Sequence, residues 1–397
     1  MVKLKKVKKV IFFVFVKLLL ISDLYAQNET DERALVRIQD GISLQRDTLF
    51  LLNLRLRIQN RFGIILNDQT NTPEFDARVR RLRLRLDGYV LSPRVQYYVQ
   101  LSFSQADQEL DRSNTPQIIR DAILYYVFSD KFYMGFGQSK LPGNRQRVIS
   151  SGSLQFVDRS LANATFNLDR DFGFFFYYNE HFSTQKINVK AAITTGEGRN
   201  AQITSAGLCY TGRIEWLPFG KFLNAGDFTE GDLEIEKYFK LSLAAGYSFN
   251  KNASRTGGQI GGQLFEHRNF STFIADGIAK YYGWALQAEY FRRHTINPIT
   301  QNTDGQIAFV YNGSGYAAQL SKFFSPGWEV ALRLATTVPD EDIKAVATRF
   351  DEYLTGVSRY LRGHRIKAQL NVGYTDRFQP SGRQRDALLT FQVEFGF

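Results

Sequence analysis

Leucine and arginine alternate in two segments near the start of the chain, LLNLRLRIQ at residues 51–59 and RLRLRLD at residues 81–87. Successive side chains point to opposite faces of a β-strand, so a repeat of two places the leucines on one face and the arginines on the other. Residues 95–104 alternate in the same way between apolar or aromatic side chains and glutamine or serine. These patterns predict strands with one apolar and one strongly polar face.

The composition removes several classes of protein. The 397 residues are 44% apolar, 14% aromatic and 22% charged, which excludes wholesale disorder. After the first thirty residues no run of eighteen apolar residues remains, so a bundle of membrane-spanning helices is not expected. One cysteine rules out a disulfide framework, and four scattered histidines give no metal cluster, so no cofactor is predicted.

The first residues have the order of an export signal. Five lysines lie in residues 1–9, an apolar run follows at residues 10–21, and Leu24-Tyr25-Ala26 precedes a polar stretch. This order is typical of a signal peptide, and cleavage is expected near Ala26. The alternative, an uncleaved membrane anchor, is disfavoured because twelve residues with a lysine inside are too few to cross the hydrocarbon.

Export also changes the charge of the protein. The whole chain carries a formal net charge of +11. Residues 1–26 contain six lysines and one aspartate, which leaves 44 basic and 38 acidic residues and a net charge of +6. So modest an excess does not predict a nucleic-acid partner.

An exported chain of alternating strands predicts a transmembrane antiparallel β-barrel of about sixteen strands in the bacterial outer membrane. Its apolar faces would meet the outer-membrane lipid and its polar faces would line a wet lumen. Short turns and longer polar links alternate along the chain, which is typical of such barrels. Residues 27–50 are interpreted as a periplasmic segment and residues 51–397 as the barrel. The link at residues 217–237 is unusually long for the short-turn side. The predicted strands are 51–61, 77–90, 94–104, 118–128, 131–137, 171–179, 186–195, 206–216, 238–250, 272–281, 284–294, 314–324, 328–337, 353–361, 365–375 and 388–397.

Arginines on two neighbouring strands are the candidate site. An arginine facing lipid at the bilayer midplane costs about 2–4 kcal/mol, so the leucine faces must meet lipid and the arginines the pore. A wall of guanidinium groups favours anions, and their planar fork suits phosphate and carboxylate. The predicted pore-wall residues are Arg55, Arg57, Arg61, Arg81, Arg83 and Arg85.

Several longer stretches carry a resemblance to a known family. They include FLLNLRLRIQNR at residues 50–61, RRLRLRLD at 80–87, GFGQSKLP at 135–142, DRDFG at 169–173 and RIEWLPFG at 213–220. In this order the chain resembles the phosphate-selective porin O/P family, in particular its members from Bacteroidetes-type bacteria. The resemblance implies a homotrimer of sixteen-stranded barrels, a third long loop folded into the lumen, and inorganic phosphate as the first candidate solute.

The loop that the resemblance places in the lumen is residues 138–170. It is more basic than acidic, and Asp158 and Arg159 are a candidate ion pair that would pin it. Its predicted constriction residues are Lys140, Arg145, Arg147, Asp158, Arg159 and Arg170.

Three functions remain open from the sequence. The first is an anion-preferring porin, the second a general diffusion porin with weak charge preference, and the third a non-conducting surface-binding or scaffold barrel. A barrel enzyme would need a histidine and a serine in phase on one wall. Because no such pair is found, no enzymatic activity and no catalytic residue are predicted.

Overall fold

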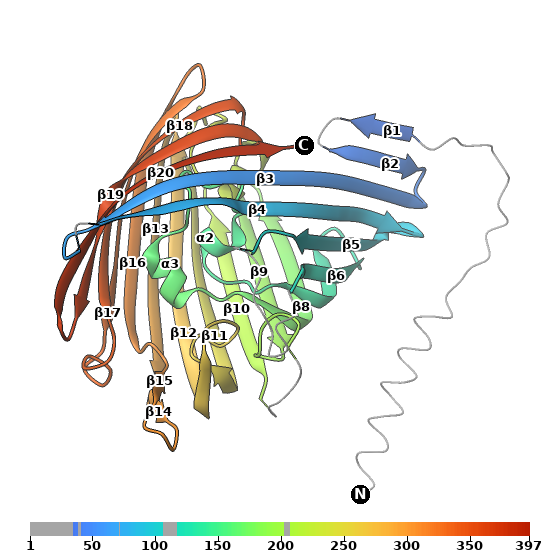
Figure 1. The fold of residues 1–397 in the computed structure, drawn as a ribbon. Coiled ribbons are helices and arrows are strands. Elements are labelled where there is room, and N and C mark those ends of the chain that lie inside the picture. Colours follow the sequence, from blue (N-terminus) through green and yellow to red (C-terminus); the bar gives the residue numbers. More distant parts are fainter. Residues whose placement is uncertain (1–34, 39–40, 71, 106–116, 202–206) are drawn as a thin grey trace, which may run out of the picture. The chain divides into compact units, whose positions relative to one another are not determined.

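A computed structural model describes the chain at residues 35–38, 41–70, 72–105, 117–201 and 207–397. The predicted signal peptide at residues 1–26 lies outside the described residues. Sixteen antiparallel strands close into a ring within the described part (Figure 1). No helix in these ranges is both long and apolar enough to cross a membrane.

The ring runs in sequence order and is closed by its last strand. β20 pairs with β3 from Gly396–Arg57 to Asp386–Asn67, so the sheet has no free edge over this stretch. A closed sheet pairs every backbone group between its own strands, which a barrel in lipid requires. The first part of the ring is β3 (Phe50–Asn67), β4 (Pro73–Val90), β5 (Ser92–Ser102), β6 (Ile119–Val127), β7 (Phe132–Lys140), β8 (Arg170–Phe182), β9 (Gln185–Thr194) and β10 (Cys209–Leu217). The second part is β11 (Lys240–Arg255), β12 (Gln263–Tyr281), β13 (Trp284–Thr295), β16 (Gly313–Phe324), β17 (Trp328–Pro339), β18 (Arg349–Arg362), β19 (Ile366–Gln379) and β20 (Gly382–Gly396).

The predicted sixteen-stranded barrel is confirmed, but several strand ends were wrong. Links predicted at residues 63–75, 251–271 and 376–387 are largely strand, and the turns between those strands are much shorter. Backbone pairing continues there although the apolar alternation has faded, because the hydrogen bonds between two strands do not depend on a lipid-facing side. Strand ends of this kind cannot be located from apolar alternation alone.

Side-chain exposure in the ring is the reverse of that in a soluble protein. On β17, Leu332 and Leu334 are 53% and 56% exposed, whereas Arg333 between them is 1% exposed. On β13, Leu286 is 50% exposed and its neighbour Gln287 is 3% exposed. Apolar residues outside and polar residues inside are the arrangement of a barrel surrounded by lipid.

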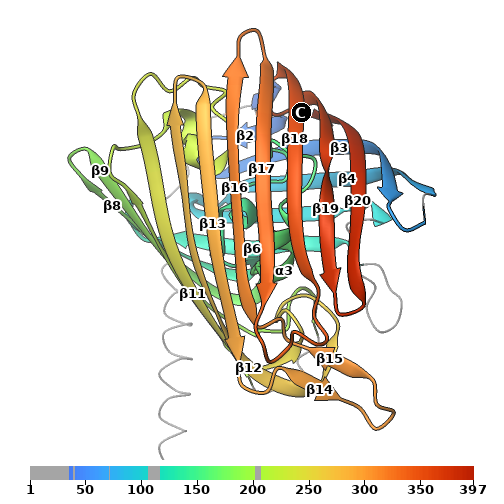
Figure 2. The same ribbon diagram turned by 90° about the vertical axis from the view of Figure 1, so that its left-hand side faces the viewer.

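Short strands outside the ring were not predicted. β1 (Leu35–Ile38) and β2 (Ile42–Arg46) form a hairpin within the segment interpreted as periplasmic. β2 pairs with the first residues of β3, which β20 does not reach. A second hairpin, β14 (Ile299–Gln301) and β15 (Ile307–Phe309), lies beyond the ends of β12 and β13 in the link to β16 (Figure 2).

Residues 141–169, between β7 and β8, fold inside the ring, as the resemblance implied for this link. They contain two short helices, α2 (Arg145–Val148) and α3 (Leu161–Phe166), which Figure 1 shows within the strands, and Figure 2 shows α3 there from another side. The backbone of α3 is capped by Ser160, whose side chain accepts from the Asn163 amide. On the wall, Gly315 makes room for the helix, because a Cβ there would lie 2.6 Å from the Phe166 ring.

Candidate functional site

The six predicted pore-wall arginines lie on the first two strands of the ring. β3 and β4 pair so that Arg55 is opposite Arg85 and Arg57 is opposite Arg83, which places these side chains on one face. That face is the lumen, because Arg57 and Arg83 donate to the Ser151 hydroxyl of the inward segment at 2.8 and 3.0 Å. The leucines between them therefore lie on the outer face.

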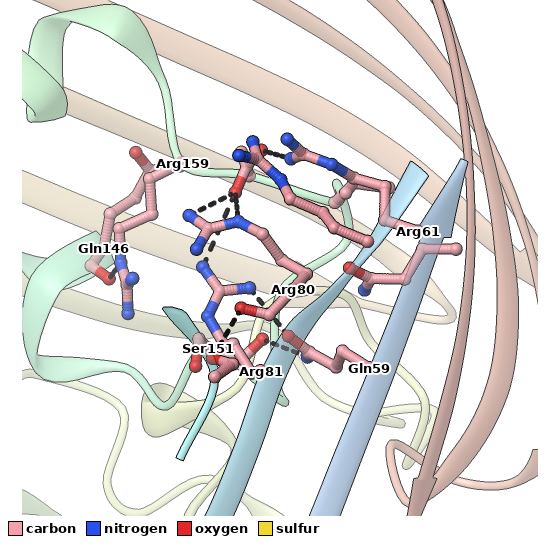
Figure 3. A network of polar contacts seen from close by, with 12 residues as sticks. Gln59, Arg61, Arg80, Arg81, Gln146, Ser151 and Arg159 are labelled. Carbon is pink, nitrogen blue, oxygen red and sulfur yellow. Dashed lines mark hydrogen bonds and ion pairs between the residues drawn. The ribbon is translucent and has the colours of Figure 1, made fainter. Parts of the chain in front are cut away.

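A β-bulge adds a cation that the alternation did not predict. The register of the two strands slips at Arg80, between the pairs Gln59–Arg81 and Asn60–Val79. An extra residue in one strand shifts the phase of the side chains that follow. Arg80 and Arg81 are neighbours in sequence, yet both point into the lumen (Figure 3). Two consecutive arginines in an alternating strand were the available signal, since both can stay in water only if the strand bulges there.

Asp158 joins the inward segment to this wall. Arg80 donates to one of its oxygens from Nε and Nη2 at 3.3 and 3.1 Å, and Arg81 approaches the same oxygen at 3.5 Å. Arg61 bonds to the other oxygen and also to Asp76, and the guanidinium groups converge in Figure 3. Desolvation within the barrel raises the pKa of Asp158, but Arg80, Arg81 and Arg61 outweigh it and hold that pKa well below its usual range. The carboxylate therefore stays charged and keeps the segment against the arginines.

Three of the other pore-wall arginines, Arg55, Arg57 and Arg85, have acidic partners within the wall. Arg85 lies 2.7 Å and Arg55 4.0 Å from the Asp87 carboxylate. Arg57 lies 3.8 Å from Glu394 on β20. The positive charge of Arg55, Arg57 and Arg85 is therefore partly compensated within the wall.

The predicted ion pair between Asp158 and Arg159 is wrong. Arg159 points away from the wall and donates to the backbone carbonyls of Gln146 and Ile149, the latter at 2.8 Å (Figure 3). A guanidinium group has five donors, so it can bridge two carbonyls of a folded segment, and Asp158 is left to the wall. Arg159 thus joins two parts of the inward segment, the stretch around residue 159 and the stretch at residues 146–149.

The remaining basic residues of the predicted constriction set are all held by polar contacts, and two of them, Lys140 and Arg170, lie on β7 and β8 rather than in residues 141–169. Arg145 is buried and lies 3.0 Å from Asp276 on β12, and it also donates to Ser242. Arg147 pairs with Asp169, and Arg170 makes two bonds of 2.9 and 3.0 Å to Asp121. Burial raises the pKa of Asp169, but Arg147 and Arg170 outweigh it and leave that pKa below its usual value. Lys140 donates to the carbonyls of Val148 and Ile149 at 3.1 and 3.3 Å.

Across the barrel, the segment covers carboxylates that sequence reasoning did not single out. Asp276, Glu289, Glu329 and Glu352 come from β12, β13, β17 and β18 and are each at most 6% exposed. Each accepts a hydrogen bond from the inward segment. The donors are the side chain of Arg145 for Asp276, the amide of Gln146 for Glu289, the side chain of Gln155 for Glu329 and the amide of Leu161 for Glu352.

A cavity of about 430 Å³ remains beside the arginine wall. Four of the predicted pore-wall arginines reach it, and Lys140 and Arg170 of the predicted loop set do so as well. Among the described residues that line it, Glu394 has the one acidic side chain. Sequence reasoning missed Tyr98, whose ring lies 4.7 Å from the Arg85 guanidinium group. The full cationic lining is Arg55, Arg57, Arg83, Arg85, Lys140, Arg170 and Arg365.

Solved structures of outer-membrane channels share this architecture. DcaP of Acinetobacter baumannii is 12% identical with a TM-score of 0.54, over 87% of this chain and 97% of that chain. OprB of Pseudomonas putida at high pH is 11% identical with a TM-score of 0.52, over 87% and 94%. A loop L8 deletion mutant of OmpT of Vibrio cholerae is 11% identical with a TM-score of 0.51, over 87% and 99%. The fold is that of an outer-membrane porin.

The sequence shows to which family of outer-membrane porins the chain belongs. The family model of phosphate-selective porin O and P matches residues 52–379, and the chain belongs to this family. The resemblance noted from its sequence stretches is thereby confirmed. A comparison with curated proteins finds no significant match.

Proposed function

We propose that this porin passes small anions passively across the outer membrane, with phosphate and similar oxyanions as its preferred solutes. The observation that carries the proposal is the lining of the 430 Å³ cavity, where the described residues include seven cationic side chains and one acidic side chain. Four carboxylates of the far wall, Asp276, Glu289, Glu329 and Glu352, are hydrogen-bonded beneath the inward segment. A diffusing ion would therefore meet mainly positive charge.

The chemistry of the lining suits oxyanions. A guanidinium group donates two parallel hydrogen bonds to a phosphate or carboxylate, and successive groups let an ion exchange partners as it moves. Conduction needs several weak sites, since one deep site would hold the ion. The acidic partners Asp87 and Glu394 favour weak sites because they compensate part of the charge of Arg55, Arg57 and Arg85.

The same acidic partners favour a second candidate, a general diffusion porin with weak charge preference. If Asp87, Asp158 and Glu394 cancel most of the field of the wall, chloride and potassium would pass at similar rates. The two candidates differ in the selectivity they predict.

Further features of the proposal concern export and assembly. We infer that residues 1–26 are a cleaved signal peptide, that residues 27–50 remain at the periplasmic end of the barrel, and that the barrel is a homotrimer. A non-enzymatic channel is the role that the family and the porin fold support. N-terminal sequencing and mass measurement of the purified protein test the cleavage site and the trimer.

Single-channel recording in planar bilayers tests the proposed function. In a potassium chloride gradient, the reversal potential should have the sign of chloride selectivity, and millimolar phosphate should reduce the chloride current in a saturable way. A reversal potential near zero without inhibition would favour the general diffusion porin, and a cation-selective sign would refute anion preference. No conductance at all would favour the third possibility, a surface-binding or scaffold barrel.

A further inference from the structure

The long link between β10 and β11, residues 218–239, folds toward the inward segment and makes contact with it. The contacts centre on Glu230, which is fully buried. Its amide donates to the Ser153 carbonyl at 2.9 Å, and its carboxylate accepts from the Gln155 amide at 2.8 Å and from the Gln146 side chain at 3.2 Å. One residue of the link therefore holds two separate parts of the inward segment.

Other link residues extend this joint. The carbonyl of Asp227 accepts from Arg145 at 2.9 Å, and Phe228 lines the cavity beside the arginine wall. Thr229 is held from the barrel wall, because Lys280 on β12 donates to its carbonyl at 3.0 Å. The link thus contacts the inward segment, the wall and the cavity.

The base of the link is fixed to the barrel rim. The Asp232 carboxylate accepts from the amides of Glu236 and Gly283, at 3.1 and 2.7 Å. Glu236 in turn accepts from the Leu223 amide at 2.6 Å, and its carbonyl accepts from the Tyr282 amide at 2.8 Å. With both ends of the link held, Glu230 is a fixed support for the inward segment rather than a mobile contact.

The two residues that bind the Glu230 carboxylate are also residues that cover the acidic wall. Gln146 donates its amide to Glu289, and Gln155 donates its side chain to Glu329. Loss of the Glu230 carboxylate would therefore loosen the two residues that cover Glu289 and Glu329.

We propose that the link and the inward segment form one two-part plug, fastened at Glu230, which covers the acidic wall and confines ions to the arginine side. Glu230 is a positioning residue in this plug, since it acts on ions through the inward segment. The expected sign of selectivity rests on the proposed function, whereas the existence of the plug does not.

Two variants test the plug by different routes. Glu230→Ala removes the carboxylate and leaves the link in place. A link-replacement variant, with residues 221–237 exchanged for Gly-Ser-Gly, removes the whole second part. Glu234→Ala is the matched control, because Glu234 is an exposed acid of the same link that bonds only within it, to Asn224 at 2.8 Å. Heat-modifiable migration on gels reports whether each barrel is closed.

Both test variants should have a higher single-channel conductance than the wild type, and their reversal potentials should shift toward the cation side as Glu289 and Glu329 become exposed. The control should match the wild type. Closed barrels with unchanged conductance and unchanged reversal potential in both variants would overturn the plug, as would a fall in conductance. A cation-selective wild type would refute the proposed function alone, because the two shifts would still report on the plug.

Discussion

Reversing the charge of two neighbouring arginines should invert the ion preference of the pore. Arg83 and Arg85 both line the cavity, and replacing both by glutamate changes the fixed charge there by four units. A sphere of the cavity's volume, 430 Å³, has a radius of roughly 5 Å, so an ion at its centre lies roughly 7 Å from the guanidinium groups and inside one Debye length.

The size of the effect follows from Coulomb's law. At that separation two unit charges in water interact by about 0.6 kcal/mol, which screening at physiological salt reduces to about 0.25 kcal/mol. Four unit changes therefore raise the free energy of a monovalent anion by about 1 kcal/mol and lower that of a cation by the same amount. The ratio of chloride to potassium permeability should fall by about thirtyfold, because the two changes add to about 2 kcal/mol.

The assay is the reversal potential in a potassium chloride gradient, with two matched controls. Replacing both arginines by glutamine changes the fixed charge by two units instead of four. It should therefore lower the ratio of chloride to potassium permeability by about fivefold. Lys344→Glu reverses a lysine that is 66% exposed in the link between β17 and β18, and it should leave the ratio unchanged. An unaltered ratio in the double glutamate variant, with a closed barrel, would show that these arginines do not face the ion path.

Three further outcomes follow from the same contacts. Because the arginines hold the pKa of Asp158 below its usual range, its stabilising contribution is complete above the ordinary carboxyl pKa and is lost only as the pH falls through the lowered value. A loosened inward segment would make the single-channel current fluctuate. These fluctuations should therefore be unchanged from pH 7 to about pH 4, whereas Asp158→Asn should increase them at every pH. Arg145→Ala removes one of two guanidinium groups that pair with the buried Asp276 carboxylate, and the other, Arg213, remains 2.6 Å from it. The substitution should lower stability by about 2 kcal/mol and expose the inward segment to protease. Gly315→Val should displace Phe166 and lower the thermal stability of the barrel, whereas normal stability would contradict the tight packing of α3.

The alternation of leucine and arginine, together with the export signal and the alternating lengths of the links, predicts the barrel. Each membrane-spanning strand faces lipid on one side and water on the other, so its sequence must record both environments. The strand ends were less accessible, because β3 and β4 continue by backbone pairing where no lipid imposes a pattern. The β1–β2 hairpin lies in residues 27–50, which were interpreted as a periplasmic segment without strands.

The candidate site was only partly accessible from the sequence. The alternation of leucine and arginine by itself identifies residues such as Arg57 and Arg83 as candidates for the lumen. The two adjacent arginines at positions 80 and 81 also indicate the bulge at Arg80, but this signal was not used. The partners of Asp158 and Glu230 depend on contacts between segments that are distant in the sequence, for which a single chain gives no pattern. For this reason the sequence predicts a pair between Asp158 and its neighbour Arg159, and it does not account for the long link at residues 217–237.

Cysteine accessibility at two adjacent positions tests the orientation of the arginine wall most directly. Arg83→Cys and Leu84→Cys are compared in a chain whose native Cys209 is fully buried, with a membrane-impermeant, negatively charged thiol reagent added during single-channel recording. The expected result is a stepwise fall in current for the variant at position 83 and none for the variant at position 84. A fall in current at position 84 with none at position 83 would place the leucines in the lumen and contradict the arginine-lined path.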